Sequence, residues 1–418
     1  MARQGAKTAV PRLRFPEFRN RQEWVAKSLK DICTVNPSND GLPSSFAYID
    51  LESVEDGVLK SKNVIDRESA PSRAQRLLRD GDVIFQVVRP YQRNNFFFRI
   101  QDGDAYVAST GYAQLRANDS DSFLYQIIHT DPFVNRVVEK CTGSNYPAIN
   151  SSDLGEVTLF APEDADEQQK VADCLTSLDE VIAAQGRKVE ALKAHKRGLM
   201  QQIFPREGET RPRHRFPEFR DAPEWREEKL GELTAIVRGG SPRPIDSFLT
   251  SNDDGLNWLK IGDVDREAMY VTKTEEKVRP EALSKTRVIQ PGDFILSNSM
   301  SFGRPYISAI KTCIHDGWIA VTRIPDNLNR EFLYYSILSE RSQSYFVDQA
   351  AGSGVQNLNK DIIKLLALGV PTVEEQQRIA DCLSSLDTQI AAEANQLAAL
   401  KTHKQGLMQQ LFPAPEAA

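Results

Sequence analysis

The sequence predicts two α/β (α+β) domains in a pseudo-two-fold arrangement, separated by a long antiparallel two-helix coiled coil. Three observations support this prediction. A 39-residue segment with helical spacing occurs twice, a short opening phrase also occurs twice, and the segments between them mix strand and helix signals. The chain has 418 residues, which is enough for two or three domains that each bury a core.

The repeated segment spans residues 167–205 and returns at 375–413, with 25 of 39 aligned positions identical. Apolar residues alternate four and three positions apart over about five heptads, which is typical of a helix with a narrow coiled-coil seam. Such a helix would be roughly 55 Å long. The predicted seam residues are Val171, Leu175, Leu178, Ile182, Val189, Leu192, Leu199, Ile203, Ile379, Leu383, Leu386, Ile390, Leu397, Leu400, Leu407 and Leu411.

The direction of pairing follows from how the chain connects the two helices. Each helix should leave the far side of its domain, so antiparallel pairing would hold the domains at opposite ends of a rod. Parallel pairing would need the second domain to return the chain along the rod, and we therefore favour the antiparallel arrangement. The alternative is two separate amphipathic helices, each packed on its own neighbouring domain.

The duplication extends beyond the helices. RLRFPEFR at residues 12–19, followed by Trp24, recurs as RHRFPEFR at residues 213–220, followed by Trp225. The spacing between other matched phrases drifts, which predicts loops of different length within a shared frame. The predicted organisation is a disordered tail (residues 1–11), a first domain (12–162), a first long helix (163–205), a linker (206–212), a second domain (213–371), a second long helix (372–413) and a tail (414–418).

The interior of each domain carries both strand and helix signals. Residues 82–88, 95–100 and 156–160 are short, β-branched or aromatic runs bounded by Gly, Asp or Pro, which predicts strands. Residues 122–140 have helical spacing, and Pro132 is expected to break that helix into two pieces. The second interior shows the same mixture, with residues 331–347 as its helical stretch.

No arrangement of residues predicts catalysis. The patterns GxxxxGK[ST] and HExxH are absent, and no GxGxxG follows a strand signal. Residues 36–39 (NPSN) begin like the NPP[YF] tetrapeptide of amino-methyltransferases but lack the aromatic residue that would stack on a flipped base. The five histidines do not cluster, and we interpret His195 and His403, at matched helix positions, as solvated. We predict no catalytic residue, no metal ligand and no cofactor held by this chain.

Cysteine spacing and hydropathy indicate a reducing cytoplasm. The five cysteines form no CxxC pair, and no apolar run approaches the ~20 residues needed to cross a bilayer. The N-terminal stretch has basic residues but no apolar core of a signal peptide. We therefore expect a cytoplasmic protein without a membrane partner.

Two polar loops at matched positions are candidates for nucleic-acid contact. Residues 89–95 (RPYQRNN) combine arginines, amides and an aromatic ring, which are residue types that bind base edges. Residues 297–304 occupy the equivalent zone of the second domain. Arg73, Arg76 and Arg79 are three apart and would form a basic stripe on a helix. The residues predicted to contact DNA are Arg73, Arg76, Arg89, Tyr91, Arg93, Asn94, Asn95, Tyr112, Ser144, Asn145, Tyr146, Lys260, Ser297, Asn298, Ser299, Arg304, Trp318, Ser353, Gln356 and Asn357.

The charge of the chain argues against a simple polyanion binder. The net charge is −6, and residues 21–160 hold 15 Lys and Arg against 19 Asp and Glu. Phosphate contacts would therefore need a locally basic face or the charge of a partner. For any single loop residue, the alternative is an ordinary surface position.

Taken together, these phrases resemble the specificity subunit of type I restriction–modification systems. The resemblance covers residues 12–413 and rests on RFPEF with its following Trp, a Gly-Ser turn before a closing proline, and the two helix phrases that begin EQQ and end in Phe-Pro. Small departures are Lys170-Val171, where Arg-Ile or Lys-Ile is usual, and a first Gly-Ser turn that runs into Tyr146-Pro147.

The resemblance implies a non-catalytic subunit with two target-recognition domains, each recognising one half of a bipartite site in double-stranded DNA. The paired helices would fix the gap between half-sites and dock two methyltransferase (modification) subunits. Those subunits would carry S-adenosylmethionine and the adenine N6 chemistry, and restriction subunits can join. Two alternatives remain: a coiled-coil adaptor whose domains bind proteins and not DNA, and an enzyme with an unrecognised site.

Overall fold

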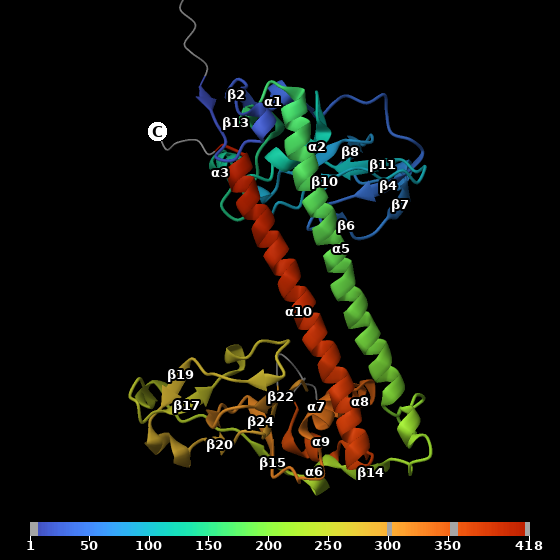
Figure 1. The fold of residues 1–418 in the computed structure, drawn as a ribbon, viewed down its shortest axis with the longest axis vertical. Helices are drawn as coiled ribbons and strands as arrows, with labels where there is room; N and C mark the ends of the chain where they lie inside the picture. Colours follow the sequence, from blue (N-terminus) through green and yellow to red (C-terminus); the bar gives the residue numbers. More distant parts are fainter. Residues whose placement is uncertain (1–6, 299–302, 352–357, 414–418) are drawn as a thin grey trace, which may run out of the picture. The chain divides into compact units, whose positions relative to one another are not determined.

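The computed structural model describes residues 7–298, 303–351 and 358–413, and these form two compact units (Figure 1). Unit 1 comprises residues 1–186 and 395–418, and unit 2 comprises residues 187–394. The long helices are α5 (Ala165–Ile203) and α10 (Val373–Leu411). Each unit therefore holds one globular domain, the first part of one long helix and the last part of the other.

The domain of unit 1 contains three main sheets and a hairpin. Their strand orders are β1-β2-β13, β10-β9-β12-β3 and β7-β4-β11-β8, and β5 pairs with β6. The strands are β1 (Thr8–Ala9), β2 (Trp24–Ser28), β3 (Cys33–Val35), β4 (Ser45–Ile49), β5 (Val54–Glu55), β6 (Val58–Leu59), β7 (Asn63–Asp66), β8 (Ala74–Leu77), β9 (Val83–Gln86), β10 (Phe96–Phe97), β11 (Tyr106–Ser109), β12 (Tyr112–Ala117) and β13 (Thr158–Ala161). The short helices are η1 (Pro16–Phe18), α1 (Leu29–Ile32), η2 (Arg67–Ser69), η3 (Pro90–Gln92), α2 (Asp121–Ile127), α3 (Asp131–Glu139) and α4 (Ser151–Gly155).

The domain of unit 2 contains the sheets β14-β25, β15-β24-β21-β22-β18 and β16-β19-β17-β23-β20. Its strands are β14 (Arg226–Lys229), β15 (Ala235–Arg238), β16 (Leu249–Thr250), β17 (Leu256–Leu259), β18 (Tyr270–Val271), β19 (Glu276–Val278), β20 (Arg287–Ile289), β21 (Phe294–Ser297), β22 (Pro305–Ser308), β23 (Thr312–Ile314), β24 (Trp318–Thr322) and β25 (Ala367–Val370). Its short helices are η4 (Pro217–Phe219), α6 (Leu230–Leu233), η5 (Ile245–Ser247), η6 (Ile261–Asp263), η7 (Pro280–Ser284), α7 (Arg330–Leu338), α8 (Glu340–Ala351) and α9 (Lys360–Leu365).

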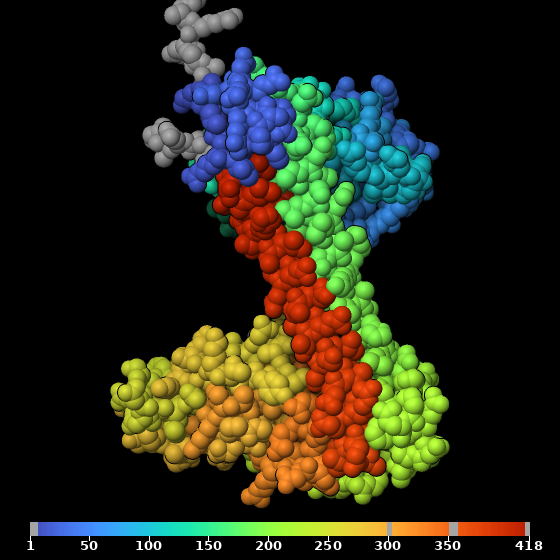
Figure 2. Space-filling view, viewed as in Figure 1, coloured from blue at the N-terminus to red at the C-terminus, as the bar shows by residue number. Residues whose placement is uncertain are grey.

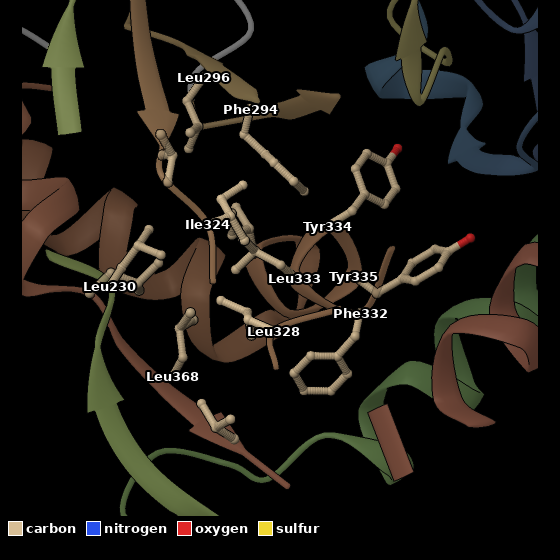
Figure 3. Packing of buried hydrophobic residues seen from close by; sticks show 14 of the residues in the cluster. Leu230, Phe294, Leu296, Ile324, Leu328, Phe332, Leu333, Tyr334, Tyr335 and Leu368 are labelled. Carbon is tan, nitrogen blue, oxygen red and sulfur yellow. The ribbon is translucent and has the colours of Figure 1, made fainter. Parts of the chain in front are cut away.

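Both domains share one strand arrangement although their sequences are hard to align. The order β9-β12-β3 in unit 1 recurs as β21-β24-β15 in unit 2, and β7-β4-β11-β8 recurs as β19-β17-β23-β20. The parallel pair β4–β11 has its counterpart in the parallel pair β17–β23. The predicted shared frame is confirmed. In unit 2, side chains of β21, α7 and β25 converge on one core, where Phe294 and Leu333 are fully buried (Figure 3).

Local chemistry sets the ends of several elements. Pro132 is the second residue of α3, where its missing N–H leaves no helix bond unmade, so the predicted break before this residue is confirmed. The stretch predicted as one helix in the second domain divides at Ser339, whose hydroxyl donates to Ser336 O at 2.7 Å. Such a side-chain bond to the backbone competes with the helix. No described helix is long and apolar enough to span a membrane.

The first residues of the described chain differ from the predicted tail. Thr8 and Ala9 form β1, which pairs antiparallel with β2 of the first domain. The Ala26 N–H donates to Lys7 O at 2.9 Å, and Thr8 Oγ1 donates to Glu23 at 2.5 Å. The ordered domain therefore begins before residue 12.

Within each unit, α5 and α10 pair with opposite directions. In unit 2, Lys188 contacts Glu393 and Lys196 contacts Asp387, both at 2.5 Å. The residue numbers along α10 therefore fall as those along α5 rise. In unit 1, the first turns of α5 share a core with the last turns of α10. All sixteen predicted seam residues are buried or half-buried. The antiparallel prediction is confirmed, and the alternative of two unpaired helices is wrong.

Each domain core is completed by the last residues of the helix that pairs with its own. In unit 1, Phe412 lies 5.9 Å from Trp24 and 5.8 Å from Phe123, measured between ring centroids. In unit 2, Phe204 lies 6.1 Å from Trp225, the counterpart of Trp24, and 5.8 Å from Phe332, the counterpart of Phe123. The N-terminal segment and the first part of α5 flank the end of α10 (Figure 2).

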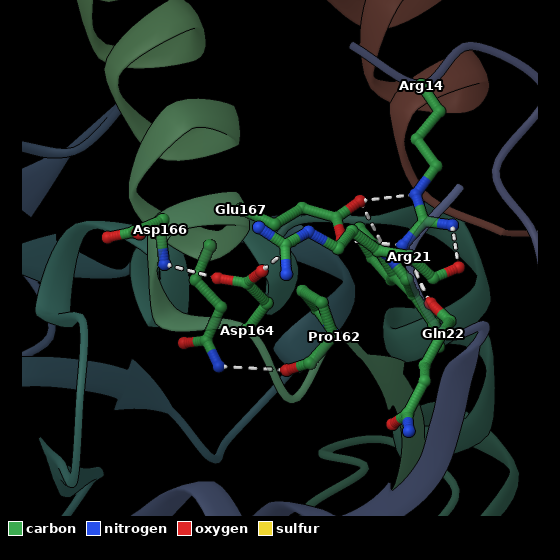
Figure 4. A network of polar contacts seen from close by, with 9 residues as sticks. Arg14, Arg21, Gln22, Pro162, Asp164, Asp166 and Glu167 are labelled. Carbon is green, nitrogen blue, oxygen red and sulfur yellow. Dashed lines mark hydrogen bonds and ion pairs between the residues drawn. The ribbon is translucent and has the colours of Figure 1, made fainter. Parts of the chain in front are cut away.

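A buried ion pair joins each opening phrase to the first turn of its long helix. Arg14 Nε and Nη2 donate to the two carboxylate oxygens of Glu167, both at 2.7 Å, and Trp24 Nε1 donates to Oε1 at 3.0 Å (Figure 4). The side chains of Arg14 and Glu167 are 6% and 1% exposed. Arg215 and Glu375 repeat the arrangement at 2.7 and 2.5 Å. We call each pair the Arg–Glu clamp.

The clamp explains why RFPEF and EQQ occur together in both copies. Arg14 Nη1 donates to Arg21 O, and Nη2, which also binds Glu167, donates to Gln22 O, so the arginine fixes the turn after the phrase. The next residue of the helix phrase, Gln168, donates to Pro162 O at 3.0 Å, as Gln376 does to Pro371 O. These bonds set the angle at which each helix leaves its domain.

Breaking one clamp should destabilise its own unit. We expect Arg14→Ala to lower the free energy of unfolding by about 3–5 kcal/mol, because it leaves the Glu167 carboxylate buried without its cation. Urea denaturation followed by circular dichroism measures this change. Lys30→Ala is the matched control, because the Lys30–Glu156 pair is exposed on both sides, and we expect little change. Equal effects of the two substitutions would contradict the assignment.

The shared core predicts that the first half of the chain dimerises. A fragment of residues 1–208 lacks Leu411 and Phe412 but carries Ile203 and Phe204 at the matched positions. We expect two copies to exchange these helix ends and form a homodimer in analytical ultracentrifugation. Phe204→Ala removes the aromatic ring, at a cost of about 3–5 kcal/mol per site, and should shift the fragment toward monomer. A stable monomeric parent fragment would refute the exchange.

Candidate nucleic-acid interface

Several loops of the first domain meet beside the end of β9. The Arg89 N–H donates to Pro147 O at 2.7 Å, the Val87 N–H donates to Gly111 O at 3.1 Å, and the Thr110 N–H donates to Arg73 O at 2.8 Å. Loop 87–95, loop 142–148 and the turn between β11 and β12 are therefore neighbours. The structure brings together the predicted residues Arg73, Arg89, Tyr91, Ser144, Asn145 and Tyr146 on this face.

This face combines the half-buried Arg89 cation with two exposed aromatic rings. The Arg89 guanidinium lies 4.3 Å from the Tyr146 ring centroid, and Tyr146 is 66% exposed. Tyr91, at the tip of the loop, is 52% exposed. Arginine is the commonest side chain to bond a guanine edge, and an aromatic ring supports its planar group or stacks on a base. The face can therefore bind nucleobases and phosphates.

Loop 89–95 has an unusual backbone. Arg89 and Arg93 both have left-handed conformations, with φ of 53° and 56°, and they flank the short helix η3. Each costs about 1–2 kcal/mol for a residue with a Cβ atom. Arg93 recovers part of this through hydrogen bonds to His129 O at 3.1 Å and Asp131 Oδ1 at 2.6 Å. Arg93 is thus engaged with the domain, and Asn94 Oδ1 accepts a long bond from the Asp56 N–H.

The three spaced arginines do not form the helical stripe that their spacing suggested. Residues 74–77 are strand β8, in which successive side chains point to opposite faces. Arg73 is exposed beside the loops, whereas Arg76 is half-buried, and burial lowers its pKa. A period of three was insufficient to distinguish a helix from a strand over so short a run.

Five of the predicted contact residues have buried side chains: Asn95, Tyr112, Ser297, Asn298 and Trp318. Asn95 Oδ1 accepts from the Gln86 N–H at 2.8 Å, and Asn298 Nδ2 donates to Asp316 O at 3.2 Å, so both hold loops in place. The two asparagines thus make internal hydrogen bonds, whereas the Tyr112 hydroxyl and Trp318 Nε1 are buried without a hydrogen-bond partner among the described residues.

In the second domain, the predicted residues are only partly placed. Ser299, Ser353, Gln356 and Asn357 lie outside the described residues. Lys260 pairs with Glu276 at 2.8 Å, and Arg304 lies 3.9 Å from Glu267. Arg304 is the last residue of the connection between β21 and β22, and Lys260 immediately follows β17.

Sequence analysis missed a cluster that the structure assembles around Asp316. Ser241 Oγ donates to Asp316 Oδ1 at 2.9 Å, Arg243 lies 3.4 Å from Oδ2, and His315 Nε2 lies 3.0 Å from Oδ1. Burial would raise the pKa of Asp316, but the Ser241 bond and the neighbouring cations outweigh it and lower the pKa. The Arg243 side chain is 80% exposed.

The feature of the sequence that could have indicated this cluster is the pair Gly239-Gly240. A Cβ atom on Gly239 would lie 2.1 Å from His315 O, so only glycine allows loop 239–244 to approach the β23–β24 turn. The cluster occupies the place in unit 2 that loop 36–44 occupies after β3 in unit 1. Loop 36–44 holds no arginine, so the arginines of unit 1 near this edge come from other loops, with Arg73 exposed and Arg89 half-buried.

The chain is similar to known proteins in sequence and in fold. Residues 223–402 match the family described as "Type I restriction modification DNA specificity domain". The type I restriction enzyme MjaVIII specificity subunit of Methanocaldococcus jannaschii is 22% identical over 280 residues, which cover 65% of this chain and 64% of that protein. The chain thus matches less than two thirds of the length of its curated relatives.

Two solved structures share the fold over nearly the whole chain. A chain from a study of complex assembly and conformational transition in the type I R-M system is 24% identical, with a TM-score of 0.59, and covers 94% of this chain and 98% of its own. The type I restriction–modification S subunit from M. genitalium is 14% identical, with a TM-score of 0.58, and covers 97% and 100%.

Proposed function

We propose that this chain, whose residues 223–402 match the family of type I restriction–modification DNA specificity domains, selects the DNA sequence on which a restriction–modification complex acts. Each domain recognises one half of a bipartite site in double-stranded DNA. The observation that carries the proposal is the repetition of one strand frame with different arginine-bearing loops at the same edge. A shared frame positions two domains alike, and different loops give each its own base preference.

The chemistry that follows recognition belongs to partner chains. Methyltransferase subunits dock on the paired helices and bring S-adenosylmethionine and adenine methylation, and restriction subunits join that assembly. The acidic balance of this chain fits a subunit that binds DNA only with the help of a partner's charge. We place the complex in the cytoplasm, in keeping with five free cysteines.

The proposal is tested by selection from a library of random duplexes in the presence of the cognate methyltransferase subunit. Enrichment of a split motif supports DNA recognition by both domains. Absence of any enriched motif would favour an adaptor that binds proteins. Methylation of DNA by the purified chain without a partner would instead support the alternative that this chain is itself an enzyme.

One arginine in each domain should act on a different half of the motif. Arg89→Ala is expected to weaken discrimination in one half-site by about 1–3 kcal/mol, and Arg243→Ala in the other half-site by a similar amount. Repeating the selection with each variant measures both effects, and each variant is the control for the other. Loss of preference in both half-sites from either substitution would contradict independent recognition.

The paired helices should set the spacer. Four residues inserted after Ala184 in α5, with four inserted in the facing part of α10, add ~6 Å of helix. At ~3.4 Å per base pair the gap between half-sites should lengthen by about one to two base pairs. Sequencing of the selected duplexes checks both the gap and the half-sites. Altered half-site sequences with an unchanged gap would refute this role.

A further inference from the structure

His129 lies between α2 and α3, and its ring bridges two parts of the first domain. Its Nδ1 atom lies 2.6 Å from Tyr125 O, and its Nε2 atom lies 3.2 Å from Asn95 Nδ2. A carbonyl oxygen only accepts hydrogen bonds, so Nδ1 carries the proton and donates it. Nε2 then accepts from the Asn95 amide.

The orientation of Asn95 supports this assignment independently. The Asn95 Oδ1 atom accepts from the Gln86 backbone N–H at 2.8 Å, which places the amide nitrogen toward His129. Asn95 is fully buried, so its side chain links the end of β9 to the imidazole without solvent. Gln86 N–H, Asn95, His129 and Tyr125 O form one chain in which every bond has a donor and an acceptor.

The surroundings keep this imidazole neutral. Burial lowers the pKa of His129 to about 4, and the cations Lys404 and Arg93 act in the same direction, whereas the Tyr125 bond and Asp179 oppose it. A proton on Nε2 would place two donors face to face across the Asn95 contact. At neutral pH the bridge therefore holds in a single protonation state.

His129 also holds the loop at a second point. Its backbone oxygen accepts from Arg93 Nη1 at 3.1 Å, and Asp131, two residues further on, binds Arg93 Nη2 at 2.6 Å. Arg93 has a left-handed backbone, which needs such support from neighbours. The end of loop 89–95 is thus fixed at Arg93 and Asn95, while Tyr91 at its tip stays exposed.

We propose that His129 is a positioning residue for base recognition by the first domain. It touches no base itself but holds loop 89–95 so that Arg89 and Tyr91 face the DNA. The inference rests on the proposed function. It divides the predicted loop into residues that contact DNA and residues, Arg93 and Asn95, that hold the loop.

The test compares His129→Leu with His129→Gln in the full chain, with the methyltransferase partner and a random duplex library. Leucine keeps the bulk but has no polar atom, and we expect discrimination in the first half-site to fall at least tenfold. Glutamine can donate to Tyr125 O or accept from Asn95, and should retain most of the preference. The second half-site is an internal control that should not change.

Two outcomes would overturn the inference. One is full first-half-site preference in His129→Leu, and the other is parallel loss in both half-sites together with a lowered melting temperature, which indicates a merely structural role. Failure of the wild-type chain to select any motif would instead remove the proposed function, so the two failures are distinguishable.

A second variant keeps the proposal testable if His129→Leu folds poorly. Asn95→Leu can neither accept from the Gln86 N–H nor donate to Nε2, so it should reproduce the first-half-site loss. The double variant Asn95→Leu/His129→Leu should lose no more than Asn95→Leu alone, because both substitutions break one bridge. Additive losses would show that the two residues act separately.

Discussion

The two Arg–Glu clamps are the constraint on which the rest of the structure depends. A carboxylate that is 1% exposed in the first turn of a helix is stable there only with a matched cation, and in each unit the bidentate arginine of the opening phrase supplies it. Because the arginine also binds the carbonyls that follow the phrase, a single side chain fixes the start of the domain, the first strand and the helix. The direction of each long helix relative to its own domain follows from this contact.

The clamp also accounts for where the two copies can differ. Three sets of residues are matched between the units: those of the clamp, those of the strands beside the clamp and those of the aromatic cluster at the helix ends. Each of these residues contacts several elements at once. Loops at the opposite edge of the sheets contact solvent and one another. They can change length and composition without disturbing the frame.

The sequence predicted the parts of this protein that rest on repetition and periodicity. The long helices and their seam follow from spacing over many residues, the antiparallel pairing from how the chain connects the two helices, and the helix break from the single residue Pro132. The candidate interface was predicted as a region but not residue by residue. Arg76 and Asn95 have the chemistry of base-binding side chains, yet the fold half-buries one and fully buries the other, and burial depends on contacts distant in sequence. His129 and Asp316 were overlooked because their partners lie 34 and 75 residues away.

The position of Phe412 has a consequence for synthesis. This ring packs with Trp24 and Phe123 in the core of the first domain, but it is six residues from the end of the chain. At roughly 5–20 residues per second, a ribosome that has finished the first long helix needs on the order of ten seconds or more to reach it. During that interval the core of the first domain lacks the Phe412 ring, whereas Phe204, which completes the core of the second domain, has already been synthesised. The half that is translated first is therefore the last to be completed.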